Sequence, residues 1–156
     1  MSEIKRVGFI GLGNMGHPMA GHVAATGCDL VVYDVSQEML ERFMAVHEAT
    51  AARSLAELGR DCDVVITMLP TSKIVRNVLL GDGSGGCVAD GLEAGNTVID
   101  MSTSDPNDTK ATGKELEAKG IRMVDVPVSG GVVFAKAASL PMNMGGEQDV
   151  LEHCKP

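Results

Sequence analysis

Residues 6–20 read RVGFIGLGNMGHPMA, an apolar run that passes directly into a glycine-rich loop. Gly11, Gly13 and Gly16 form the pattern G-x-G-x-x-G. The run before them is typical of a short buried strand, and apolar residues recur at helical spacing after them. A strand, this loop and a helix, in that order, predict a loop that holds the phosphates of a dinucleotide.

Each part of the loop has a physical task. Gly11 permits the tight turn, Gly13 lets a pyrophosphate approach the backbone, and Gly16 lets the helix pack closely on the strand. The free N–H groups at the helix start then face the phosphates, and the helix dipole favours their charge. Pro18 places the start of the regular helix no earlier than Met15, since proline is tolerated only near a first turn.

An acidic residue closes the second apolar run, DLVVY at 29–33. This residue, Asp34, lies eighteen positions after Gly16, near the spacing of about 20 expected for an acid that binds the adenosine ribose. Its carboxylate would accept hydrogen bonds from both ribose hydroxyls, whereas a 2′-phosphate would place like charges together. The sequence therefore predicts NAD in preference to NADP. The alternative is a glycine turn with a surface aspartate. The predicted cofactor residues of this part of the chain are Gly11, Leu12, Gly13, Asn14, Met15, Gly16 and Asp34.

Apolar strands alternate with helices along the rest of the chain. Near-continuous apolar strands of this kind predict βαβ units and a parallel sheet covered on both faces. The fold class is therefore α/β, a Rossmann-type doubly wound, mainly parallel sheet with helices on both faces. No linker interrupts residues 1–156, so we expect one dinucleotide-binding domain. The predicted strands are 6–10, 29–33, 48–51, 62–68, 96–100 and 121–126, and the predicted helices are 14–26, 36–46, 55–59, 74–79, 105–120 and one from Glu147.

Ligands of such a sheet lie beyond the carboxyl ends of its strands. Those ends carry uncharged tips, at 68–71, 101–104 and 127–131, which suits a nicotinamide and a small polar substrate. For 102–104, helix capping ahead of Asp105-Pro106 is an equally good interpretation. At 129–131 a serine and two glycines could form an anion nest for a carboxylate, although an ordinary turn has the same composition.

Net charge and composition exclude several classes of binding partner. The formal net charge of −8 gives the chain no electrostatic reason to bind nucleic acid or an anionic membrane. The opening MSEIKR does not resemble a secretory signal, so we expect a cytoplasmic protein, or one of the mitochondrial matrix if eukaryotic. The four cysteines form no C-x-x-C pair and are expected to be reduced structural thiols. His17 and His22 are five residues apart, so they do not share one helix face, and we expect no metal site.

Four segments together resemble the β-hydroxyacid dehydrogenase family: GFIGLGNMGHPMA at 8–20, ITMLPTSKIVRNVLLGDG at 66–83, VIDMSTSDP at 98–106 and DVPVSGG at 125–131. The resemblance covers essentially the whole chain. It implies hydride transfer between NAD and a small-molecule 3-hydroxy acid, with 3-hydroxyisobutyrate oxidised to methylmalonate semialdehyde, a step of valine catabolism. It also implies that the full-length enzyme is a homo-oligomer. The further site residues that it implies are Leu69, Pro70 and Ile74 beside the cofactor, Thr103 near the nicotinamide, and Ser129, Gly130 and Gly131 at the substrate carboxylate.

One departure from the family pattern lies shortly after the turn at 129–131. Ala138 occupies a position where the family has glycine, two residues before Leu140. The backbone there has less freedom than glycine would give it, which bears on the fit of the substrate.

A second departure concerns the general acid/base of the reaction. In the family this group is a lysine on a following helical domain, and neither Lys136 nor Lys155 matches its context. We therefore expect the family lysine to lie beyond Pro156, the last residue of the sequence, so that residues 1–156 are the cofactor-binding domain with no catalytic residue of their own. The alternatives are a related reductase of tartronate semialdehyde, succinic semialdehyde or glyoxylate, a non-catalytic nucleotide-binding module, and a methyltransferase.

Overall fold

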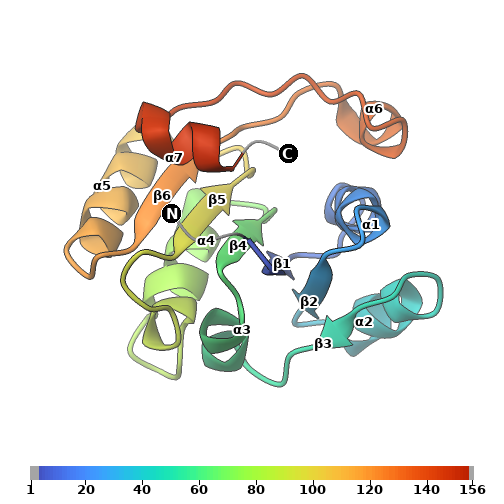
Figure 1. The fold of residues 1–156 in the computed structure, drawn as a ribbon, viewed down its shortest axis with the longest axis horizontal. Coiled ribbons are helices and arrows are strands. Elements are labelled where there is room, and N and C mark those ends of the chain that lie inside the picture. Colours follow the sequence, from blue (N-terminus) through green and yellow to red (C-terminus); the bar gives the residue numbers. More distant parts are fainter. Residues whose placement is uncertain (1–3, 155–156) are drawn as a thin grey trace.

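The computed structural model describes residues 4–154, which form one six-stranded sheet (Figure 1). The strand order is β3-β2-β1-β4-β5-β6, and every neighbouring pair is parallel. The chain thus winds outward from β1 in one direction and from β4 in the other. This arrangement confirms the predicted doubly wound α/β fold. The strands are β1 (Arg6–Ile10), β2 (Asp29–Tyr33), β3 (Thr50–Ala51), β4 (Val64–Thr67), β5 (Thr97–Asp100) and β6 (Arg122–Asp125).

Within the described residues, seven α-helices and one short 3₁₀ helix, η1 (Val88–Asp90), accompany the strands. Separate apolar cores show that α1, α2, α6 and α7 cover one face of the sheet, while α3, α4 and α5 cover the other. The helices are α1 (Gly16–Ala25), α2 (Gln37–Met44), α3 (Leu55–Asp61), α4 (Ser72–Leu80), α5 (Pro106–Glu117), α6 (Gly131–Lys136) and α7 (Gln148–His153).

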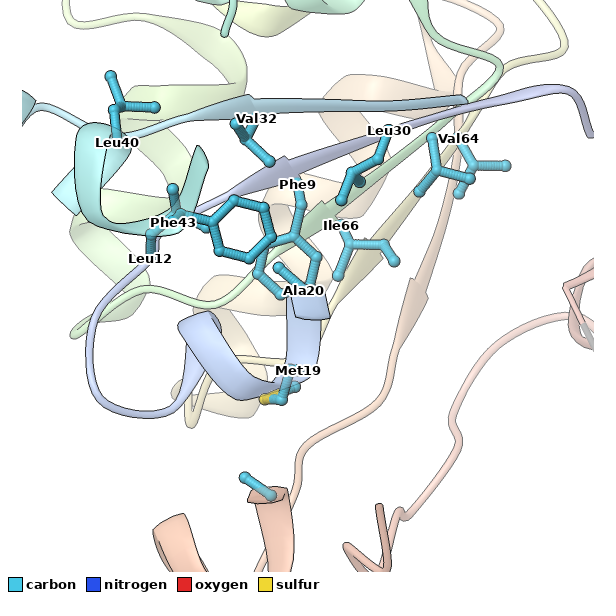
Figure 2. Close-up of a cluster of buried hydrophobic side chains, with 12 residues drawn as sticks. Phe9, Leu12, Met19, Ala20, Leu30, Val32, Leu40, Phe43, Val64 and Ile66 are labelled. Atoms are coloured by element: carbon cyan, nitrogen blue, oxygen red, sulfur yellow. The ribbon is translucent and has the colours of Figure 1, made fainter. Parts of the chain in front are cut away.

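The side-chain alternation of the central strand divides its residues between the two faces. Phe9 is fully buried under α1 and α2, whereas the next residue, Ile10, belongs to the core on the opposite face. Figure 2 shows Phe9 beside Ala20 of α1 and close to Phe43 of α2. Burying a phenylalanine contributes about 1.5–3 kcal/mol. The position of α1 against β1 is therefore fixed by packing, and with it the loop that joins them.

Side-chain caps explain where four of the helices begin. Ser36, Ser54 and Thr71 accept a hydrogen bond from the third backbone N–H after them, at the starts of α2, α3 and α4. Asp105 caps α5, and Pro106 occupies its first position. Each such cap contributes about 0.5–2 kcal/mol. Thr71 also explains why α4 begins at Ser72, two residues earlier than the sequence analysis placed it.

The segment after β6 is the largest difference from the sequence-based expectation. No helix was predicted at α6, whose N-cap residue, Gly130, has a φ of +100° that favours glycine. Figure 1 shows the chain running from β6 out to α6 and returning to α7. On its return it pairs antiparallel with its outgoing half, at Val128–Met142 and Asp125–Gly145. Among residues 4–154, Ala138 is the one non-glycine residue with positive φ, at 51°. That conformation fits the glycine that the family pattern carries there.

The two lysines considered as acid/base candidates fall in different parts of the chain. Lys136 is the last residue of α6, on the segment that leaves and rejoins the sheet. Lys155 and Pro156 lie outside the described residues. The expectation that the family lysine lies beyond Pro156 therefore stays a prediction.

All four cysteines lie within residues 4–154 and are free, as the sequence analysis predicted. Burial raises the pKa of Cys62 to about 12, so this thiol is unreactive. Within the described part of the chain, no helix is both long enough and apolar enough to cross a bilayer. The same residues contain no group of three His, Cys, Asp or Glu side chains that could hold a metal ion.

Candidate functional site

The glycine loop joins β1 to α1 at the carboxyl end of β1, next to the point in the sheet where the strand order reverses, and its shape depends on two glycines. The N–H of Gly11 donates to the carbonyl oxygen of Tyr33 (3.0 Å), and its φ is +98°. A side chain at Gly11 would collide with the Met68 carbonyl oxygen, and one at Gly16 would collide with the carbonyl oxygen of Gly11 itself. The turn and the first residue of α1 therefore leave no room for a Cβ.

Gly13 differs from both, because a Cβ there would meet nothing within 4 Å. Beside it, Met15 is the N-cap residue of α1, which has no side-chain cap and no acidic residue in its first turn. The N–H groups of Gly13, Asn14 and Met15 donate to no group among residues 4–154. The positive end of the helix dipole thus faces open space, as an anion site requires.

Asp34 lies beside this loop and already has two hydrogen-bond donors. Its Oδ2 accepts the N–H of Leu12 (2.7 Å), and its Oδ1 accepts the N–H of Ser36 (2.8 Å). An ionised carboxylate has about four lone-pair sites, so both oxygens can accept further bonds from ligand hydroxyls. Asp34 therefore ties the glycine loop to the start of α2 and still presents acceptors to a ligand, a double role that the sequence analysis did not foresee.

A cavity of about 440 Å³ opens over the loop, within the range of small-molecule sites. Most of the predicted cofactor residues line it, namely Gly11, Gly13, Asn14, Met15, Gly16, Asp34, Leu69, Pro70 and Ile74. Leu12 does not, because its side chain is fully buried in the core, and only its N–H takes part through Asp34. The cavity also has lining residues that the sequence analysis missed: Ile10, Tyr33, Val35, Met68 and Val78. Val35 is apolar and yet 93% exposed. Its position directly after Asp34 could have indicated from the sequence that it lines the cofactor cavity.

The carboxyl ends of β4 and β5 are joined by a buried network that the sequence analysis missed. Asp100 is fully buried and accepts from the Thr67 hydroxyl (2.8 Å) and the Ser102 N–H (3.0 Å). The Ser102 hydroxyl in turn accepts the N–H of Leu69 (2.9 Å). Asp100 thereby holds the Leu69 wall of the cavity in place. The sequence did carry one indication of this network, because Asp100 ends an apolar strand with a carboxylate, much as Asp34 follows β2.

The predicted substrate turn lies apart from this cavity. Ser129, Gly130 and Gly131 lie at the start of α6, and Thr103 is exposed after β5. None of them lines the cavity over the glycine loop. The N–H of Ser129 donates to the Pro141 carbonyl oxygen (3.1 Å), so it is not free for an anion. The nest predicted from the sequence did not use this N–H; it consists of the Ser129 hydroxyl and the N–H groups of Gly130 and Gly131, and it stays a prediction.

Comparison with known proteins shows the family. The model for the NAD binding domain of 6-phosphogluconate dehydrogenase matches residues 6–156. The chain belongs to this family. Its members are oxidoreductases that use a nicotinamide dinucleotide, and the relatives below are β-hydroxyacid dehydrogenases or similar reductases, as the four sequence segments implied.

Three similar proteins illustrate the range of this family. Mouse mitochondrial 3-hydroxyisobutyrate dehydrogenase is 41% identical over 96% of this chain and 43% of its own length. Escherichia coli 3-sulfolactaldehyde reductase is 39% identical over 96% of this chain and 49% of its own. The solved structure of Mycobacterium tuberculosis 3-hydroxyisobutyrate dehydrogenase with L-serine matches with a TM-score of 0.88 and 33% identity, over 98% of this chain and 50% of that one. The chain thus spans about half the length of these relatives.

The residues of this NAD-binding domain suit the cofactor that its family implies. The uncapped N–H groups of α1 suit a pyrophosphate, and the free space at Gly13 gives it access to the backbone. Asp34 would supply acceptors for ribose hydroxyls beside that space. The exposed side chains of Val35 and Ile74 would supply apolar surface for a flat base.

Proposed function

We propose that this NAD-binding domain belongs to an enzyme that transfers hydride between NAD and 3-hydroxyisobutyrate, giving methylmalonate semialdehyde. The observation that carries the cofactor part is the uncapped start of α1 beneath an open cavity, with space for a ligand at Gly13. When bound, the nicotinamide supplies the hydride acceptor, and the described residues supply binding and orientation.

NAD is proposed in preference to NADP because of Asp34. The carboxylate lines the cavity and is held by two backbone N–H groups, so it stays close to any ribose that the cavity binds. A 2′-phosphate placed against it would add repulsion between like charges, whereas a 2′-hydroxyl can donate to it.

The substrate proposal depends on the turn at 129–131 and on the names of the relatives. The turn offers one hydroxyl and two glycine N–H groups at the carboxyl end of the sheet, which suits the anionic end of a short hydroxy acid. A second candidate is 3-sulfolactaldehyde, since a reductase of that aldehyde is 39% identical. Both molecules are small and anionic, and they differ in carrying a carboxylate or a sulfonate.

The proton of the substrate hydroxyl needs an acceptor as hydride leaves. No lysine or histidine among the described residues lines the cavity over the glycine loop. We therefore propose that the acceptor is the lysine of a following helical domain, beyond Pro156, as the family pattern implies. Loss of such a group lowers the rate about 10²–10⁴-fold. Residues 1–156 alone should accordingly bind NAD without appreciable turnover.

Two measurements test this function together. Isothermal titration of residues 1–156 should show NAD binding and no S-adenosylmethionine binding, which would reject the methyltransferase alternative. The complete gene product should then be assayed against 3-hydroxyisobutyrate, 3-sulfolactaldehyde and the semialdehyde or glyoxylate alternatives, with NAD(H) and NADP(H). NAD binding without turnover of any of them would favour the non-catalytic module instead.

A variant at the turn separates substrate binding from folding. In the complete gene product, Ser129→Ala should raise KM or lower kcat for the hydroxy acid and leave NAD affinity nearly unchanged, because the side chain lies outside the cofactor cavity. Equal losses in both would assign Ser129 to the fold.

Compartment and assembly are also proposals. We propose a cytoplasmic protein, with the mitochondrial matrix as the alternative that the mouse relative's name favours. We propose that the full-length enzyme is a homo-oligomer, which analytical ultracentrifugation of the complete gene product would check.

A further inference from the structure

A second cavity, of about 400 Å³, lies on the other side of the glycine loop. It shares Gly13 and Asn14 with the cofactor cavity but opens between α1, α2 and α6. No described aspartate or glutamate lines it, although the chain as a whole carries a net charge of −8. The proposed hydride transfer makes no use of this cavity.

Aromatic packing holds two histidine rings at its wall. His17 meets the buried Phe43 edge to face at 5.1 Å between ring centroids, and His47 lies against Phe43 at 4.6 Å. The absence of a Cβ at Gly21 lets the His47 ring rest directly on α1. The Nδ1 atom of His17 is buried and has no hydrogen-bond partner among residues 4–154. The rings are thus fixed in place, and a buried nitrogen is left unused.

Two cations complete the wall of this cavity. Arg42 reaches it from α2, and Lys136 reaches it from α6. Neither forms an ion pair or a hydrogen bond through its side chain within the described part of the chain, whereas Arg6, Arg53 and Arg76 each pair with a carboxylate. By contrast, His22 is engaged, since its Nε2 donates to the carbonyl oxygen of Ala135 (2.9 Å).

We infer that this cavity binds a phosphate group, held by the Arg42 guanidinium with donors from His17, His47 and Lys136. A guanidinium presents a planar fork of N–H donors that matches phosphate geometry, and imidazole nitrogens add donors around it. Burial lowers the pKa of His17, and the positive charges of His47 and Arg42 contribute to that shift. An anion bound beside these groups would act against the repulsion between them. The phosphate site itself does not depend on the proposed function; only the NADP source named below would also require dinucleotide binding in the cofactor cavity, and it would overturn the proposed preference for NAD.

Two sources of that phosphate are chemically equivalent. One is free inorganic phosphate or a small phosphate ester that binds beside NAD. The other is the 2′-phosphate of NADP, which would reach this cavity from the shared loop residues, Gly13 and Asn14. In the first case phosphate and dinucleotide bind together, and in the second NADP competes with phosphate.

The experiment is a titration of the chain with inorganic phosphate, followed by the NMR shifts of the His17 and His47 side chains. Wild type should saturate, and Arg42→Gln should weaken the affinity about tenfold or more, the scale of one charge-assisted contact, while Arg42→Lys should keep part of it. Arg60→Gln is the matched control, because it removes the same charge from an exposed arginine outside this cavity. The control should bind phosphate as wild type does.

Repeating the titration with saturating NAD or NADP identifies the source. Phosphate that still binds with NAD present supports a separate ligand, and phosphate displaced by NADP but not by NAD supports the 2′-phosphate. Non-saturating shifts, or equal affinities in Arg42→Gln and Arg60→Gln, would overturn the inference. The inference would also be overturned if NAD displaced the phosphate and Arg42→Gln left the phosphate affinity unchanged, since the phosphate would then occupy the cofactor cavity.

Discussion

Replacing Gly13 by alanine tests whether the open space at the helix start is reserved for a ligand. The φ of Gly13 is not among the positive values, and a methyl group there would meet no protein atom within 4 Å. The free energy of unfolding should therefore stay the same or rise by about 0.4–1 kcal/mol, because alanine restricts the unfolded chain. Since the substitution should not lower the stability of the fold, its effect should appear as weaker NAD binding.

The expected loss is that of the charge-assisted hydrogen bonds from the start of α1. A methyl group between the N–H groups and a pyrophosphate would separate them, and such bonds contribute about 1.5–3 kcal/mol. That corresponds to an NAD dissociation constant about 10- to 150-fold higher. Isothermal titration gives the affinity, and urea unfolding of the same sample gives the stability.

Gly16→Ala provides the contrast. Its Cβ would collide with the Gly11 carbonyl oxygen, so overpacking should cost about 1–3 kcal/mol of stability. The pair separates a ligand-facing glycine from a packing glycine within one motif. If Gly13→Ala were stably folded and bound NAD with unchanged affinity, the pyrophosphate could not rest on this helix start, and the cofactor placement would be wrong.

Substitutions at four further positions have expected outcomes. Asp34→Ala should weaken NAD binding in calorimetry by about 1–3 kcal/mol and also lower the urea midpoint, because two backbone donors lose their acceptor; unchanged affinity would remove Asp34 from the site. Asp100→Ala should cost about 2–6 kcal/mol in urea unfolding by leaving two buried donors unpaired, and Asp100→Asn should cost less. Ala138→Gly should add about 1 kcal/mol of stability, since it relieves a left-handed backbone, and no gain would mean that the strain is absent. Burial, and then the charge of Asp100, raise the pKa of Asp125, so the stability that protonated Asp125 contributes is lost as the pH rises through its raised pKa. In urea unfolding from about pH 4 to 7, the free energy of unfolding of Asp125→Asn should therefore rise relative to that of wild type. A difference between the two proteins that does not change with pH would contradict the raised pKa.

The sheet could be predicted from sequence because its strands are short apolar runs bounded by turn residues, as at 6–10 and 29–33. The glycine loop could also be predicted, because the pattern G-x-G-x-x-G directly after an apolar run can be recognised from the sequence alone, although the Met68 carbonyl that Gly11 approaches belongs to a distant part of the chain. α6 was not, because a double glycine signals a turn, and what makes this segment helical is packing of Ala135 and the bond from His22. Both are contacts with a distant element.

The polar network beneath the cavity was also beyond local patterns. Asp100 looked like the last residue of a strand, and Ser102 looked like one of several hydroxyls before a helix. Their connection to Leu69 appears only when β4 and β5 lie side by side in register. The basic cavity behind the loop is similar, because His17 is far in the sequence from Arg42 and His47, and the three meet only where α1 packs beside α2.

The two backbone bonds of Asp34 bear on any attempt to change coenzyme preference. Replacing this residue by a neutral or basic one would remove the charge that repels a 2′-phosphate. It would also weaken or remove the two hydrogen bonds that hold the glycine loop to the start of α2. Asparagine has one acceptor oxygen for two donors, and arginine has none. A domain redesigned to prefer NADP would thus also need a new hydrogen-bond acceptor for the Leu12 N–H, so that the glycine loop keeps its shape.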